Sequence, residues 1–126
     1  MLFRQFLLVG AGGALGSMAR YGVSFVMSKF LQETYKFGAT FTINIIGSLI
    51  IGILFGLTAR HPAMKEGSYL FLASGFCGGF TTFSSFALEN VKLMNGGQSF
   101  LAFAYIGLSV VVGLVLCRLG IWLVHV

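Results

Sequence analysis

The residues best placed to act chemically lie in Ser74–Glu89, which holds three glycines and a run of threonines, serines and phenylalanines. Gly75, Gly78 and Gly79 weaken a helix, and the hydroxyl side chains offer the backbone competing hydrogen bonds. The stretch lies inside an apolar segment, and a helix broken at membrane depth exposes N–H and C=O groups. Protein, water or an ion must then satisfy those groups. The pattern predicts a broken membrane helix, and we interpret the break as an ion site.

Two phenylalanines, Phe83 and Phe86, follow the predicted break. Residues three positions apart share a face once a helix resumes, so their rings should lie together. The edge of an aromatic ring is electropositive, and an anion can therefore approach it edge-on. The alternative, on these two residues alone, is ordinary core packing or contact with lipid.

Two polar side chains stand inside otherwise apolar runs. Burying Arg20 costs at least about 2.5 kcal/mol on insertion scales, so it should face a partner, a cavity or an aqueous vestibule. Its alternative is to snorkel to the membrane surface near Ser28. Asn44 offers N–H donors without a negative charge, which suits a small anion that has left water. Its alternative is an interhelical hydrogen bond worth about 1–2 kcal/mol.

The composition excludes several classes of protein. The chain is 57% hydrophobic and 9% charged, whereas a soluble domain carries about 25% charged residues. Its net charge of +5 comes from basic residues scattered singly, which argues against nucleic-acid binding. Cys77 and Cys117 have no metal-ligand spacing and are predicted to be buried thiols. The sequence has no cluster of His, Cys, Asp and Glu residues of the kind that would indicate an enzyme active site.

Four apolar runs, at residues 5–28, 37–59, 68–88 and 100–122, each have about the 20 residues needed to cross a bilayer. The loops between them are short, so we expect an all-α membrane protein with a single four-span domain over residues 1–126. The first run is also compatible with a signal peptide ending near Ser17–Ala19. Its glycines and its apolar continuation past Arg20 favour a membrane span instead.

Small and polar residues recur at every fourth position along three of these runs, and such rows predict surfaces that face other helices. The rows are Gly12, Gly16, Arg20, Ser24 and Ser28; Thr40, Asn44, Ser48, Gly52 and Gly56; and Tyr105, Ser109, Gly113 and Cys117. Apart from Arg20, the basic residues are almost balanced between the two sides of the membrane, which leaves the orientation undetermined. One side has Arg4, Arg60, Lys65 and Arg118, and the other has Lys29, Lys36 and Lys92.

The segment Gly78–Phe86, which reads Gly-Gly-Phe-Thr-Thr-Phe-Ser-Ser-Phe, resembles the signature of the Fluc (CrcB) family of bacterial fluoride channels. That signature is Gly-Gly, a bulky apolar residue and then Thr-Thr-Phe-Ser-Thr/Ser-Phe. Two further segments are similar to the family, Gly16–Tyr21 in the first run and Gly38–Asn44 at the start of the second. The resemblance therefore covers essentially the whole chain.

The resemblance implies a passive channel that exports fluoride across the bacterial inner membrane and confers fluoride resistance. It implies an antiparallel, dual-topology homodimer with two pores, and a structural Na⁺ on the dimer axis held by the backbone carbonyls of Gly78 and Thr81. It places Arg20 and Glu89 at the pore mouth, although the sequence by itself favours a solvated loop charge at Glu89. The implied fluoride pathway comprises Thr40, Asn44, Thr82, Phe83, Ser84, Phe86, Tyr105 and Ser109.

Two departures from the family pattern stand out. Phe80 is bulkier than the usual Leu, and Gly113 stands where some members have Ser, which leaves one hydroxyl fewer for the ion. A small four-span multidrug exporter is an alternative function. It requires a carboxylate within the membrane, whereas the only acids are Glu33, Glu66 and Glu89. A structural subunit of a larger membrane complex is a third alternative.

Overall fold

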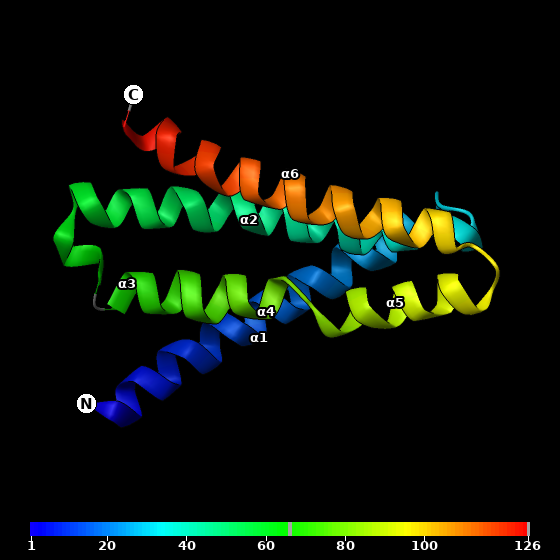
Figure 1. Ribbon diagram of the computed structural model, residues 1–126. Coiled ribbons are helices and arrows are strands. Elements are labelled where there is room, and N and C mark those ends of the chain that lie inside the picture. Colours follow the sequence, from blue (N-terminus) through cyan, green and yellow to red (C-terminus); the bar gives the residue numbers. More distant parts are fainter. Residues whose placement is uncertain (66, 126) are drawn as a thin grey trace.

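Four long helical spans make up the molecule in the computed structural model, which describes residues 1–65 and 67–125 (Figure 1). The first, second and fourth spans are single helices, α1 (Leu2–Ser28), α2 (Phe37–Arg60) and α6 (Ser99–His125). Short 3₁₀ turns, Glu33–Tyr35 and Pro62–Lys65, lie in the first two loops. All four spans are long and apolar enough to cross a membrane, which confirms the predicted four-span, all-α architecture. Glu66, one of the three acids considered above, lies outside the described residues.

The third span is built from four consecutive helical pieces. They are α3 (Gly67–Tyr69), the π-helix η3 (Leu70–Cys77), α4 (Gly78–Phe80) and α5 (Ser84–Asn95). Helical structure stops at residues 81–83, and Thr81 is extended, with φ −80° and ψ 158°. The predicted break is therefore present. The span ends at a turn in which Gly97 has a φ of 79°, a conformation that favours glycine.

The glycines of the third span do not themselves make the break, contrary to the expectation from sequence. Gly75 and Gly79 stay helical and lie against α1, where Cβ atoms would come within 2.9 Å of the Val9 carbonyl oxygen and 3.0 Å of the Gly13 Cα, respectively. Their small size is needed for close packing between helices. The chain leaves the helix only after Phe80, where the hydroxyl residues begin.

Glycines also bring the other helices together. Helices α2 and α6 run side by side in the same direction, and the third span runs antiparallel to both (Figure 1). A Cβ at Gly52 of α2 would overlap the backbone carbonyl of Cys117 on α6, and one at Gly16 of α1 would overlap the Phe76 carbonyl. At these positions the predicted small-residue rows do face neighbouring helices.

Adding one methyl group at the α2–α6 contact should therefore destabilise the fold. We expect Gly52→Ala to cost about 1–3 kcal/mol through overpacking against backbone, which does not move aside as a flexible side chain would. Gly107→Ala on α6 is the matched control, because no other group lies within 4 Å of a Cβ there. Thermal unfolding of the two variants in detergent would compare them. Equal melting temperatures would show that the contact tolerates a methyl group.

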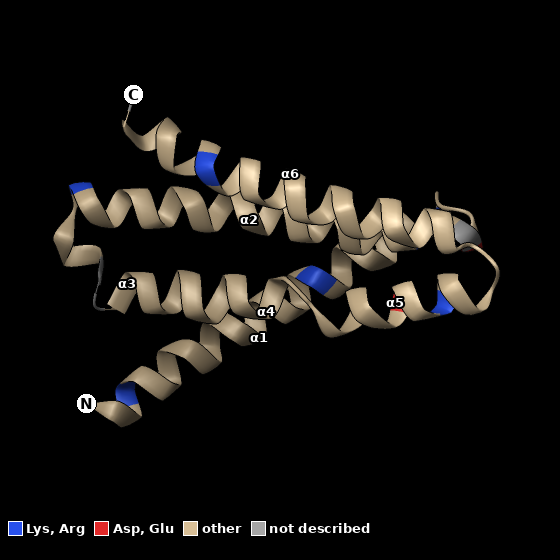
Figure 2. Cartoon of the chain, viewed as in Figure 1, with Lys and Arg blue, Asp and Glu red and all other residues tan. Residues whose placement is uncertain are grey.

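The surface of the bundle is suited to lipid. Large apolar side chains are exposed along the helices, such as Phe3 at 73%, Leu114 at 68% and Phe103 at 65%. Basic residues lie mainly toward the two ends of the molecule, with one on α1 close to the point where it crosses the third span (Figure 2). On α1, Arg20 hydrogen-bonds to the third span.

Candidate functional site

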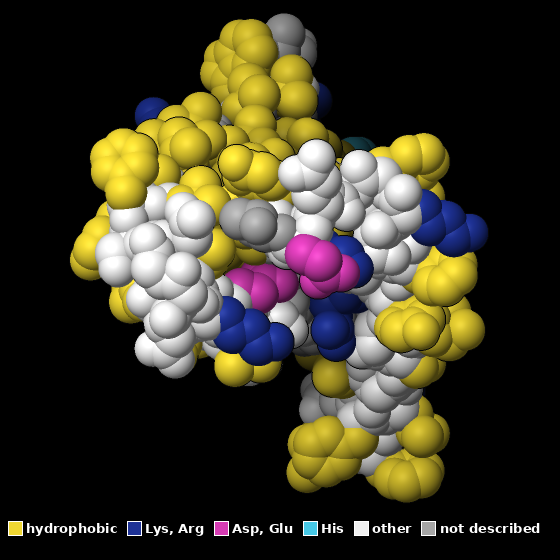
Figure 3. Space-filling view, turned by 90° about the vertical axis from the view of Figure 1, so that its right-hand side faces the viewer, with side chains coloured by type: hydrophobic (Ala, Val, Ile, Leu, Met, Phe, Trp, Pro, Cys, Tyr) yellow, Lys and Arg dark blue, Asp and Glu magenta, His cyan; other side chains and the backbone are white. Residues whose placement is uncertain are grey.

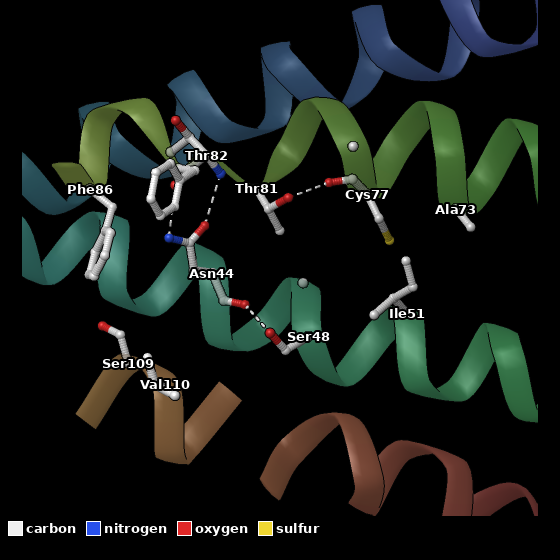
Figure 4. A pocket seen from close by; sticks show the side chains of 13 residues that line it. Asn44, Ser48, Ile51, Ala73, Cys77, Thr81, Thr82, Phe86, Ser109 and Val110 are labelled. Carbon is white, nitrogen blue, oxygen red and sulfur yellow. Dashed lines mark hydrogen bonds between the residues drawn. The ribbon is translucent and has the colours of Figure 1, made fainter. Parts of the chain in front are cut away.

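The break in the third span is held by side chains from two other helices. A helix that ends at Phe80 interrupts the ladder of backbone hydrogen bonds. The last bond of this ladder before the break runs from the Thr81 N–H to the Cys77 carbonyl at 3.0 Å, and the next begins at the Phe83 carbonyl, which accepts from the Ala87 N–H at 2.8 Å. Asn44 of α2 spans the gap with two hydrogen bonds (Figure 4). Its Nδ2 donates to the Thr82 carbonyl at 3.0 Å, and its Oδ1 accepts from the Thr82 N–H at 2.9 Å. The side chain of Asn44 thus supplies Thr82 with the two hydrogen bonds that a continuous helix would have given it.

Arg20 performs a similar task from α1. Its Nε donates to the Gly79 carbonyl at 3.0 Å, in a half-buried position. This bond gives the guanidinium a partner inside the span, so snorkelling to the membrane surface is not needed to explain it. The pore-mouth role that the resemblance implies for Arg20 stays a prediction.

Two carbonyls beside the break, those of Gly78 and Thr81, accept no hydrogen bond from the residues that the structure describes. The helical donor for the Gly78 carbonyl would be the Thr82 N–H, but that group donates to Asn44 instead. Thr81 is extended, and no bond to its carbonyl occurs among the described residues. Both residues line the same cavity. Carbonyl oxygens are hard ligands, so this pair fits the Na⁺ site that was predicted there.

The break opens into a cavity of about 430 Å³, here named the central cavity (Figure 4). It brings together five of the predicted pathway residues from α2, α6 and the third span, and Ser109 among them has a buried Oγ without a partner among the described residues. Phe83 is 78% exposed, so the cavity is open at that side. Its lining is Asn44, Gly47, Ser48, Ile51, Ala73, Cys77, Gly78, Thr81, Thr82, Phe83, Phe86, Ser109 and Val110.

The aromatic pair lies together as its spacing predicts. The Phe83 and Phe86 ring centroids are 5.9 Å apart, with the ring planes inclined at 45°. Phe86 also meets Tyr105 of α6 edge to face, at 5.0 Å and 70°. Phe86 is thereby fixed by packing, whereas Phe83, the residue before α5, is largely exposed.

Glu89 is not a solvated loop charge, so that expectation is wrong. It lies in α5 and is half-buried, and two hydroxyl groups donate to its carboxylate. The Thr40 Oγ1 donates to Oε2 at 2.6 Å, and the Tyr105 hydroxyl donates to Oε1 at 2.8 Å. Thr40 and Tyr105 were both predicted to line the fluoride pathway. In this structure their hydroxyl groups donate to Glu89 instead.

A second cavity, of about 490 Å³, lies at the end of the molecule formed by the first and third loops. We call it the vestibule; acidic and basic side chains gather near the centre of this end (Figure 3). Glu89 lines it and contacts Tyr105, which in turn packs on Phe86 of the central cavity. A chain of contacts thus leads from one cavity to the other. The vestibule is lined by Glu33, Lys36, Phe37, Glu89, Lys92, Leu93, Gly96 and Gln98.

The positions of two serines differ from what the family resemblance or the residue pattern suggests. Ser84 is exposed on α5 and lines neither cavity. Ser48, in contrast, lines the central cavity, although its row indicated only helix packing. The signal that points to it is its spacing, one helical turn beyond Asn44.

Comparisons with known proteins agree on one family. Residues 7–121 match the family described as CrcB-like protein, Camphor Resistance (CrcB). The chain is 47% identical to the fluoride-specific ion channel FluC of Chlorobium phaeobacteroides, over 91% of this chain and 90% of that one. It is 42% identical to the protein of the same name from Flavobacterium psychrophilum, over 90% of each chain. With that from Leptospira interrogans the identity is 38%, over 96% of this chain and 94% of the relative.

Proposed function

The chain belongs to the CrcB family, and on that premise we propose that it is a fluoride-selective channel of the bacterial inner membrane. It lets cytoplasmic fluoride leave passively and so confers resistance to fluoride. A membrane potential that is negative inside drives an anion outward by about 2.3 kcal/mol per charge per 100 mV. The protein carries no catalytic role, because the relatives are channels.

The observation that carries the proposal is the broken third span beside an aromatic pair and the Asn44 amide. A channel must replace the hydration shell of its ion with groups of the protein. Amide N–H groups, hydroxyls and ring edges supply positive partial charge without a competing anion. We assign the pathway to the predicted residues Thr40, Asn44, Thr82, Phe83, Ser84, Phe86, Tyr105 and Ser109, with Arg20 and Glu89 at the mouth.

A multidrug exporter needs a carboxylate within the membrane, and Glu89, half-buried within the third span, is such a carboxylate. The carboxylate criterion therefore does not decide between the exporter and the channel. The relatives favour the channel, and the lining of the central cavity does too. That cavity has no charged side chain among its described residues. An organic cation would find no counter-charge there, whereas a small anion would find donors.

The test is fluoride efflux from vesicles. Proteoliposomes loaded with potassium fluoride would be diluted into fluoride-free buffer, and a fluoride electrode would record release when valinomycin lets K⁺ carry the counter-charge. We expect rapid release that depends on both protein and valinomycin. Vesicles loaded with potassium chloride and read with a chloride electrode should retain their anion. Release no faster than from protein-free vesicles would refute the channel.

The working unit in this proposal is an antiparallel homodimer. Phe83, at 78% exposure, leaves the central cavity open in one protomer, and a second copy would close it. The near balance of basic residues fits insertion in both orientations. The orientation can be measured with a single cysteine in place of Gln98, in a chain whose own cysteines are replaced by alanine. Dual topology predicts that a thiol reagent labels this cysteine from both sides of the membrane. Labelling of intact cells from only one side would contradict dual topology.

The same dimer would hold Na⁺ with the free carbonyls of Gly78 and Thr81 from each copy. Four neutral oxygens suit a hard monovalent cation, which would tie the two breaks together. Protein purified and assayed with K⁺ as the only alkali metal ion should lose fluoride flux and regain it with Na⁺. Unchanged flux in the two salts would argue against the site.

A further inference from the structure

Ser48 faces a gap that Gly113 leaves open between α2 and α6. A Cβ added to Gly113 would meet the Ser48 Oγ at 3.4 Å and no other group within 4 Å. Ser48 lies one helical turn beyond Asn44, and Gly113 lies one turn beyond Ser109. On α2 the polar lining of the central cavity therefore continues from Asn44 to Ser48. On α6 the position opposite Ser48 is Gly113, which has no side chain.

The Ser48 hydroxyl is free to change partners. It donates to the Asn44 carbonyl of its own helix at 2.8 Å (Figure 4). A carbonyl has two lone pairs and lies within the α2 helical ladder, so it does not depend on this hydroxyl. A serine O–H also rotates readily about its C–O bond. The proton can thus turn from the helix toward an ion at little cost.

We propose that Ser48 is a fluoride-coordinating residue, which donates its O–H to the ion beside Asn44 and Ser109. This inference rests on the proposed function, and adds a donor that the family pattern does not assign. The proposed contact with the ion lies one helical turn beyond Asn44 along α2. Asn44, Ser48 and Ser109 all line the central cavity there. Because Gly113 has no side chain, α6 places no group against the Ser48 Oγ at this position.

Flux measurements on Ser48→Ala would test the assignment. Loss of one hydrogen bond to the permeating ion should slow fluoride efflux by about two- to tenfold, with an unchanged elution profile in detergent. Ser48→Thr retains the hydroxyl and should keep wild-type flux. Thr42→Ala is the matched control. Thr42 makes the same kind of bond on α2, to the Gly38 carbonyl at 2.8 Å, but lines neither cavity.

Rescue across the gap separates coordination from helix packing. The double variant Ser48→Ala, Gly113→Ser returns a hydroxyl to the same space from α6 and should bring flux back to within about twofold of wild type. Wild-type flux in Ser48→Ala, an equal loss in Thr42→Ala, or failure of this rescue would each overturn the inference. A wild-type protein without any fluoride flux would instead overturn the proposed function.

Discussion

Replacing Phe83 or Phe86 with isoleucine is expected to abolish fluoride efflux from proteoliposomes. Isoleucine keeps an apolar side chain of useful size but lacks the electropositive ring edge that an anion can approach. Both rings line the central cavity, 5.9 Å apart. If they carry the ion, loss of either should interrupt the path, so the two single variants should each fall to the rate of protein-free vesicles.

The structural effects of these two changes should differ, which makes the result easier to interpret. Phe83 is largely exposed, so its replacement should hardly alter the stability of one protomer. Phe86 packs edge to face on Tyr105, and such aromatic contacts contribute about 0.5–1.5 kcal/mol beyond simple burial. Phe103→Ile serves as the control, because Phe103 is exposed on α6 and lines neither cavity. Wild-type flux from both Phe83→Ile and Phe86→Ile would show that fluoride does not depend on the aromatic pair.

The sequence predicts the four spans well, because lipid imposes a simple demand on composition. A helix that faces hydrocarbon must be apolar along about 20 residues, and only a few residue types can interrupt it. The position of the break is harder to predict. Gly75 and Gly79 look like helix breakers in isolation, yet contact with α1 keeps them helical. Their role depends on a neighbouring helix, which local propensity does not reveal.

The partners within the site could not be predicted for the same reason. Asn44 and Thr82 are 38 positions apart, and Arg20 and Gly79 are 59 apart. Periodicity places a residue on a face of its own helix but does not say which residue lies opposite. Glu89 is the clearest case, since the hydroxyls that surround it come from α2 and α6. From its neighbours in sequence alone it looked like an exposed charge.

One physical constraint links the fold to the function. Hydrocarbon offers no hydrogen bonds, so a break in a membrane helix must be satisfied by side chains from elsewhere in the protein. Those side chains then lie beside polar backbone groups that line the central cavity. Asn44 combines both roles, since its amide holds Thr82 and also lines the central cavity. A change at Asn44 should therefore affect stability and flux together.

Two substitutions at Asn44 should separate these roles. Asn44→Ala leaves the Thr82 N–H and C=O without partners, and each unsatisfied buried group costs about 1–3 kcal/mol. Asn44→Asp can still accept from the Thr82 N–H but cannot donate to its carbonyl when ionised. It also places a negative charge in the cavity. At about 4 Å and an effective dielectric constant of about 20, that charge would repel fluoride by about 4 kcal/mol.

We therefore expect Asn44→Asp to lower fluoride efflux by more than about 100-fold, because a barrier of about 1.4 kcal/mol already gives a factor of ten. Asn44→Ala should unfold at a lower temperature than wild type. Asn90→Ala is the control for removing a buried amide, since Asn90 is 4% exposed in α5 and lines neither cavity. Its flux should stay near wild type at equal amounts of folded protein. Wild-type efflux from Asn44→Asp would mean that the ion does not pass the amide, and the pathway would then have to run outside the central cavity.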